Sequence, residues 1–182
     1  KSKKGPVMFD TDEHPRSDAS MEGMAKLKPA FAKENGSVTA GNASGINDAA
    51  AAVVLMERKA AEAKGLKPMA RLLAYGHAGI DPKIMGLGPV TAVQNALRKA
   101  GLKLSDMDVI ESNEAFAAQA LGVSKELGMD GAKVNPNGGA VALGHPIGAT
   151  GAILTVKCLY ELQRTGGRYG LVTMCIGGGQ GI

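Results

Sequence analysis

Aromatic residues are scarce in this chain. Phe, Tyr and Trp together make up 3% of the 182 residues, and Trp is absent, whereas apolar residues as a whole make up 45%. The length is that of one domain with a substantial core, which must therefore be built from Ala, Val, Leu, Ile and Met. Charged residues, at 21%, complete a composition typical of a soluble globular protein.

Blocks of like charge are also missing. The net charge of +4 is spread along the chain, and Arg does not alternate with aromatic residues. Such alternation and clustering mark many nucleic-acid-binding surfaces. A nucleic-acid partner is therefore disfavoured, and an anionic small molecule fits the mild positive excess better.

The chain has few cysteines and no long apolar run. No stretch reaches the ~18 residues of a membrane span, and residues 1–16 resemble neither a signal peptide nor a transit peptide. Cys158 and Cys175 show no metal-ligand spacing and imply no disulfide framework. We therefore expect no metal, no membrane and a reducing, cytoplasmic location. The chain opens in mid-loop and stops where a strand is expected, so we expect a piece of a longer protein, truncated at both ends.

Periodicity predicts alternating helices and strands. The expected helices cover residues 21–31, 48–64, 90–100, 115–127 and 149–163, and the expected strands cover residues 38–42, 70–75, 108–111 and 168–174. This alternation predicts an α/β fold in which helices cover both faces of a sheet and ligands bind at strand ends. We place the domain at residues 37–182, incomplete at its end, after a partial loop or linker region at residues 1–36.

Glycine is the residue type that the chain has in excess. Of its 26 glycines, five lie between Asn135 and Ala152, together with two prolines and His145. Three more follow Cys175 and Ile176. Because glycine permits conformations and close approaches that other residues avoid, both bends are candidate ligand sites.

His145 and Cys175 are candidates for chemistry from the residues alone. His145 precedes Pro146 and the start of an expected helix, whose positive end favours a neutral imidazole that can act as a base. The thiol of Cys175 lies at a strand end, beside glycine N–H groups that can bind an oxyanion. A structural histidine and a buried core cysteine are the alternatives, and the apolar pattern around Cys158 predicts burial.

Other candidates lie in loops and at helix starts. Asn113 can cap the following helix or hold a water or carbonyl oxygen, and Glu114 can be a base or a favourable partner of the helix dipole. Ser44, in the loop from Gly41 to Asp48, can bind a ligand or serve as a turn residue. Met85 is either a flexible ligand contact or part of the core.

Four motifs together resemble those of the thiolase family. They are NEAFAAQ at residues 113–119, NPNGG…GHPIGATGA at 135–152, CIGGGQG at 175–181 and AGNASGIND at 40–48. The resemblance covers nearly the whole chain and is closest to bacterial acetyl-CoA acetyltransferases and short-chain 3-ketothiolases. It implies the C-terminal half of a thiolase-like fold, whose two similar α/β halves pack in layers. A ketoacyl-ACP synthase has a second histidine in place of Cys175, so the last motif argues against that related enzyme.

The resemblance implies an acyl-CoA C-acetyltransferase. Thiolases condense two acyl-CoA molecules or cleave a 3-ketoacyl-CoA with CoA. By resemblance, His145 activates the nucleophilic cysteine, Cys175 moves the α-proton, and Asn113 holds a water that completes an oxyanion hole with His145. The N–H of Gly177 belongs to a second oxyanion hole. No cofactor is implied beyond the coenzyme A thioester that serves as substrate.

The resemblance also implies a coenzyme A site and an assembly. Residues implied to contact the pantetheine arm, the acyl tunnel or the adenine end are Ala43, Ser44, Met85, Phe116 and Arg16. A homo-oligomer, a dimer or tetramer, and a place in fatty acid metabolism are implied as well. The nucleophilic cysteine of the family has no counterpart here, because Cys158 does not match it. The alternative is therefore a catalytically incompetent module that binds CoA or dimerises.

Overall fold

A parallel pair of strands lies at the centre of the folded part of the chain. In the computed structural model, which describes residues 5–182, β2 (Val109–Ser112) pairs with β3 (Gly170–Thr173) from Val109–Gly170 to Ser112–Thr173. All four residues of β2 are buried. Burial on both faces is expected where helices cover a parallel sheet from both sides.

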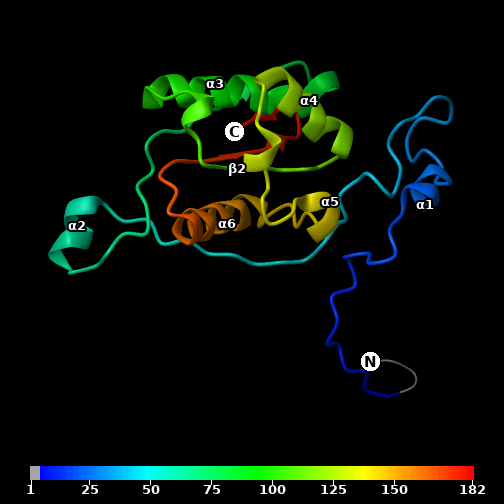
Figure 1. Ribbon diagram of the computed structural model, residues 1–182, viewed down its shortest axis with the longest axis horizontal. Coiled ribbons are helices and arrows are strands. Elements are labelled where there is room, and N and C mark those ends of the chain that lie inside the picture. The colour runs from blue at the N-terminus through cyan, green and yellow to red at the C-terminus, as the bar shows by residue number, and fades with distance from the viewer. Residues whose placement is uncertain (1–4) are drawn as a thin grey trace.

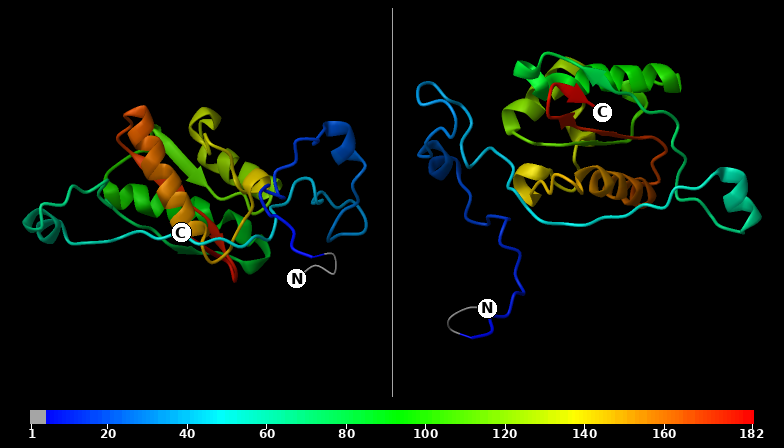
Figure 2. Two further views of the ribbon diagram at one scale, coloured as in Figure 1. Left: turned by 90° about the horizontal axis from the view of Figure 1, so that it is seen from below. Right: turned by 180° about the vertical axis from the view of Figure 1, so that it is seen from behind.

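Three long helices provide this cover, as Figures 1 and 2 show. α6 (Thr150–Thr165) packs against β2 and β3 on one side, while α3 (Gly88–Ala100) and α4 (Ala117–Leu127) lie on the other. The buried core between α3 and the strands contains Val93, Met107, Ile110 and Leu171. The predicted α/β fold with helices on both faces of a sheet is confirmed.

The helix ends follow from local sequence signals. Gly101, Gly128 and Gly166 end α3, α4 and α6 in the left-handed region, with φ of 67°, 65° and 71°. Glycine adopts this conformation without the steric cost of a Cβ. Pro89 lies in the first turn of α3, where its missing N–H costs no hydrogen bond. These three helices therefore end within three residues of their predicted bounds.

A second, antiparallel sheet carries the end of the chain. Its order is β1 (Ala78–Gly79), β5 (Gln180–Gly181) and β4 (Cys175–Ile176). A Cβ on Gly88 would overlap the Gln180 carbonyl, and one on Gly181 would overlap the Gly88 backbone. Glycine at both positions therefore allows α3 to approach β5 closely.

The remaining short elements connect these layers. Three are 3₁₀ helices, η1 (Pro82–Leu87), η2 (Leu104–Asp106) and η3 (Gly131–Lys133), and one is the short helix α5 (Ala140–Leu143). Within residues 5–182, no helix is both long and apolar enough to span a membrane. The boundary predicted at residue 36 stays a prediction.

Residues 5–75 contain little regular structure, and several predictions there were wrong. Only α1 (Met21–Ala25) forms within 21–31, and only α2 (Arg58–Ala63) within 48–64. Residues 38–42 and 70–75 form no strand. Val54 and Leu55 are 89% and 81% exposed. Short helices and unpaired strands derive most of their stability from packing, so their apolar sequences alone did not suffice.

Candidate functional site

Asn113 and Cys175 lie at the same edge of the central sheet. Asn113 directly follows β2, and Cys175 comes two residues after the end of β3. The Asn113 N–H donates to the Thr173 carbonyl at 3.0 Å, which fixes the ends of the two strands together. Because parallel strands point the same way, their C-terminal ends present these side chains on one rim.

His145 reaches this rim from the loop between α5 and α6. Its backbone N–H donates to the Gly45 carbonyl at 3.0 Å, and it forms a β-bridge with Ile46. The ring nitrogen Nε2 lies 3.3 Å from Nδ2 of Asn113. The structure thus brings together two of the predicted catalytic residues, which are 32 positions apart in the sequence.

Thr150 determines which nitrogen of His145 carries the proton. Its Oγ1 lies 2.7 Å from Nδ1 of His145 and donates to the Pro146 carbonyl at 3.1 Å. When its one proton is directed to the Pro146 carbonyl, the hydroxyl accepts from Nδ1–H. Nε2 then presents a lone pair and accepts from the Asn113 amide. Each donor along this chain of hydrogen bonds meets an acceptor, which favours the tautomer with a free base at Nε2.

Burial shifts the acid–base properties of both candidate catalytic groups. It lowers the pKa of His145 from its usual 6.5, so the imidazole is neutral at pH 7. It raises the pKa of the Cys175 thiol above 9.0, partly offset by a backbone hydrogen bond. The site therefore holds a neutral base and a protonated thiol, which can accept and donate a proton respectively.

Cys175 leads into a tight glycine turn. Gly178 and Gly179 adopt φ of 84° and 87°, which only glycine reaches without strain. Gly177 is exposed, and a Cβ there would meet no heavy atom within 4 Å. An exposed N–H beside a strand end can bind a developing oxyanion. This geometry is compatible with the role predicted for Gly177.

Three of the residues predicted to bind coenzyme A lie together. Ala43 forms a bridge with Phe116, and the N–H and hydroxyl of Ser44 both reach the Ala115 carbonyl, at 3.1 Å and 2.9 Å. The ring of Phe116 meets that of Phe31 edge to face, with centroids 5.9 Å apart. The loop at residues 41–46 is thereby held between the start of α4 and His145.

Met85 and Arg16 lie apart from that group. Met85 is half-buried in η1, which packs against α4 and β4, the strand that carries Cys175. Arg16 is exposed in the N-terminal segment and forms an ion pair with Asp18 at 2.9 Å. Their predicted contacts with coenzyme A stay predictions.

Cys158 fills a structural position, as its apolar surroundings predicted. It is 5% exposed on α6, and burial together with nearby Glu111 raises its pKa to about 11. Glu111 itself is fully buried on β2 and pairs with Lys157 at 2.9 Å. Burial raises the pKa of Glu111, and Lys157 opposes that shift. Among the described residues, no group of three or more His, Cys, Asp or Glu side chains could hold a metal ion.

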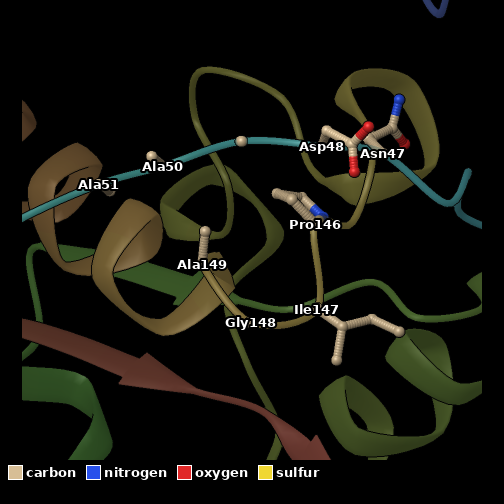
Figure 3. A pocket seen from close by; sticks show the side chains of 9 residues that line it. Asn47, Asp48, Ala50, Ala51, Pro146, Ile147, Gly148 and Ala149 are labelled. Carbon is tan, nitrogen blue, oxygen red and sulfur yellow. The ribbon is translucent and has the colours of Figure 1, made fainter.

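A pocket opens beside the His145 loop (Figure 3). It has a volume of about 340 Å³ and lies between residues 47–51, which run extended past the start of α6, and residues 146–149. Asn47 and Asp48 border it on one side, and Pro146 and Ile147 on the other. The Oδ1 atom of Asn47 is buried and has no hydrogen-bond partner in the described residues. No sequence signal marks Asn47 or Thr150 as a site residue, because neither residue type is unusual in a turn.

Two family models match the chain. The model for the thiolase C-terminal domain matches residues 66–182, and the model for the thiolase N-terminal domain matches residues 1–59. The chain belongs to the thiolase family. The resemblance inferred from the four motifs is confirmed.

Relatives of this thiolase chain are named beta-ketothiolase or acetyl-CoA acetyltransferase. It is 70% identical over 182 residues to the beta-ketothiolase BktB of Cupriavidus necator, covering 100% of this chain and 46% of that protein. It is 58% identical over 183 residues to the acetyl-CoA acetyltransferase of Syntrophomonas wolfei, again with 100% and 46% coverage. The chain thus spans about half the length of these curated relatives.

Solved structures agree with this assignment. The acetyl-CoA acetyltransferase of Bacillus anthracis matches with a TM-score of 0.92 at 54% identity, covering 100% of this chain and 46% of that one. Human mitochondrial 3-ketoacyl-CoA thiolase, solved in complex with CoA, matches with a TM-score of 0.87 at 47% identity, covering 95% and 44%. These scores and identities confirm a thiolase-like fold for this chain.

Proposed function

We propose that this chain supplies the acid–base and oxyanion-binding part of an acyl-CoA C-acetyltransferase within a longer protein, called the full-length protein below. The observation that carries the proposal is the contact between Asn113 and His145, 3.3 Å apart, at the sheet edge that also carries Cys175. Relatives with 70% and 58% identity that are named beta-ketothiolase and acetyl-CoA acetyltransferase support the same reaction class.

In the cleavage direction, the reaction uses His145 first. Its Nε2 lone pair exchanges the Asn113 amide contact for the proton of a cysteine thiol that lies outside this chain, and the thiolate attacks the 3-keto carbon of the substrate. The bond between carbons 2 and 3 breaks, and the resulting carbanion takes the Sγ proton of Cys175 to give acetyl-CoA. The Cys175 thiolate then deprotonates CoA, whose thiolate removes the acyl group from the enzyme, and the released cysteine thiolate takes its proton back from His145. Condensation runs through the same steps in reverse.

Oxyanions form at two of these steps and need hydrogen-bond donors. The buried Oδ1 atom of Asn113 has no partner among the described residues, so it is available to hold a bridging water beside His145. The N–H of the exposed residue Gly177 is proposed to stabilise charge at the cysteine side. One well-placed donor of this kind contributes about 10²–10³-fold in rate.

Cys158 does not provide the nucleophile. It is 5% exposed, and its pKa of about 11 keeps the thiol protonated at neutral pH. The remaining thiol, Cys175, is assigned to proton transfer. The acylated cysteine is therefore proposed to lie outside the 182 residues.

The substrate and setting complete the proposal. Acetyl-CoA or another acyl-CoA and free CoA are the partners, with Ala43, Ser44, Met85, Phe116 and Arg16 along the CoA-binding path. The CoA thioester is substrate, and no separate cofactor takes part. A cytoplasmic homo-oligomer, a dimer or tetramer, acting in fatty acid metabolism is the setting proposed.

Acylation of the isolated chain tests where the nucleophile lies. We expect no stable acetyl group on the chain after incubation with acetyl-CoA, as measured by intact-protein mass spectrometry, and a stable acetyl group on the full-length protein. Acetylation of the isolated chain would contradict the placement of the nucleophile. An unlabelled full-length protein that still binds CoA would favour the alternative of a binding module.

Substitution of His145 tests the reaction itself. In the full-length protein, His145→Ala removes the base, and we expect thiolysis to fall by about 10²–10⁴-fold. His77→Ala is the matched control, because His77 is exposed and its side chain only stacks on Tyr75, with centroids 6.4 Å apart. Near-normal turnover of the His145→Ala protein would refute the assignment.

A further inference from the structure

Two side chains link the loop of Asn113 to the loop of His145. Glu114 follows Asn113, and its Oε1 and Oε2 atoms accept from Nδ2 of Asn135 and from the Val141 N–H, both at 3.1 Å. Val141 lies in the first turn of α5, which leads directly to His145. The carboxylate thus spans from the end of β2 to the segment that carries the base.

Asn135 holds the other side of the same strand end. Its Oδ1 accepts from the Ser112 N–H at 2.9 Å, and its Nδ2 donates to the Ser112 carbonyl at 2.8 Å. Its backbone N–H donates to Ile110 at 2.8 Å. Asn135 reaches this position with φ of 46°, a left-handed conformation that asparagine tolerates better than most residues. The Asn135 side chain therefore holds both backbone groups of Ser112, the residue before Asn113, as a neighbouring strand would.

Gly139 and two N–H donors surround the Glu114 carboxylate. A Cβ on Gly139 would overlap the carboxylate carbon and both its oxygens, so glycine leaves the space that the group fills. Both oxygens face N–H donors, from Asn135 and from Val141. A carboxylate accepts at both oxygens, whereas an amide accepts at one and donates at the other. The site therefore selects a carboxylate and not its isosteric amide.

We infer that Glu114 and Asn135 are positioning residues that align Asn113 with His145 for proton transfer. The inference rests on the proposed thiolase function. The contact between Asn113 Nδ2 and His145 Nε2 is 3.3 Å, near the long end of a hydrogen bond, so a small shift of either loop breaks it. Glu114 and Asn135 connect these loops over 21 to 27 positions of sequence, through contacts that do not touch the reacting atoms.

Glu114→Gln in the full-length protein tests the inference. One of the two donors then faces an amide N–H, and leaving a part-buried polar group without its partner corresponds to about a 5- to 150-fold effect. We expect kcat for thiolysis to fall by that factor while KM for CoA changes little, and we expect a crystal structure of the variant to show Asn113 Nδ2 and His145 Nε2 separated beyond hydrogen-bond distance. Glu126→Gln, at an exposed position on α4, the helix that follows Glu114, is the control.

A double variant keeps the test decisive if the single variant is unstable. Asn135→Asp removes the donor to Glu114 and to the Ser112 carbonyl in the single and the double variant alike, whereas adding Glu114→Gln restores a hydrogen bond between the two side chains with donor and acceptor exchanged. We expect the double variant to lose less activity than the product of the two single losses. Strict multiplication of the two losses would overturn the inference.

The structural readout separates this inference from the proposed function. If the unmodified full-length protein has no thiolase activity, the proposed function fails, but a separated Asn113–His145 pair in the Glu114→Gln crystal structure still supports the positioning role. If the unmodified protein is active and Glu114→Gln keeps both its kcat and the contact, the positioning role is wrong and the function stands.

Discussion

Replacing Thr150 with valine removes the hydroxyl that orients the catalytic histidine while keeping the shape of the side chain. Thr150 is 3% exposed, and its Oγ1 lies 2.7 Å from His145 Nδ1. The Pro146 carbonyl loses one donor but keeps the N–H groups of Ala149 at 2.7 Å and Thr150 at 3.0 Å. The His145 ring, in contrast, loses the hydrogen-bond partner of Nδ1.

The size of the effect follows from the two states left to the imidazole. If Nδ1 keeps its proton, a buried donor has no partner, which costs about 1–3 kcal/mol. If the proton moves to Nε2, it points at the Asn113 amide, donor against donor, and the free base is lost. Since about 1.4 kcal/mol corresponds to a tenfold change, we expect kcat for thiolysis to fall by about 5- to 150-fold.

Steady-state kinetics of the full-length protein measure this effect against two controls. Thr150→Ser keeps the hydroxyl and should keep most of the activity. Thr155→Val removes a hydroxyl from the same helix that donates only to the Gly151 carbonyl at 2.8 Å, so kcat should not change. If Thr150→Val turns over at the normal rate, or if serine fails to rescue it, Thr150 does not set the tautomer of His145.

Two further predictions concern pH and packing. Burial lowers the pKa of His145, and only the neutral ring accepts a proton. We therefore expect kcat/KM for thiolysis to rise with pH and to be half-maximal below pH 6.5. A midpoint above pH 7 would contradict His145 as the base. Gly88→Ala places a Cβ against the Gln180 backbone carbonyl, so we expect the free energy of unfolding to fall by about 1–3 kcal/mol, seen as a lower Tm. The control is Gly131→Ala, where a Cβ meets nothing within 4 Å and Tm should hardly change. Equal Tm values for the two variants would show that the backbones of α3 and β5 can move apart.

Local signals in the sequence predicted the parts of the fold that carry their own start and stop residues. α3 has a proline in its first turn and a left-handed glycine after its last residue, and α4 and α6 also end at glycines with φ of 65° and 71°. The strands before Asn113 and Cys175 were recognisable as short apolar runs. Because each candidate residue follows such an element, their common location at one sheet edge followed from the α/β alternation.

The hydrogen-bond partners in the site could not be predicted in the same way. A capping role or a dipole interaction was the local interpretation of Glu114, yet its carboxylate accepts from Asn135 and Val141, 21 and 27 positions away. Thr150 is an ordinary residue for a helix start until the ring of His145 is placed beside it. Contacts of this kind depend on how distant loops meet, and a single sequence carries no periodic signal for them.

The segment at residues 48–57 shows the opposite limit, where local propensity was strong and still did not decide the structure. Four alanines followed by Val53, Val54, Leu55 and Met56 favour a helix, but the helix begins only at Arg58. Alanine contributes at most a few tenths of a kcal/mol per residue over other good helix formers. Val54 and Leu55 are 89% and 81% exposed, so apolar packing does not offset the conformational entropy lost on ordering the segment. Helix formation there requires an apolar surface against this segment, and residues 5–182 do not provide one.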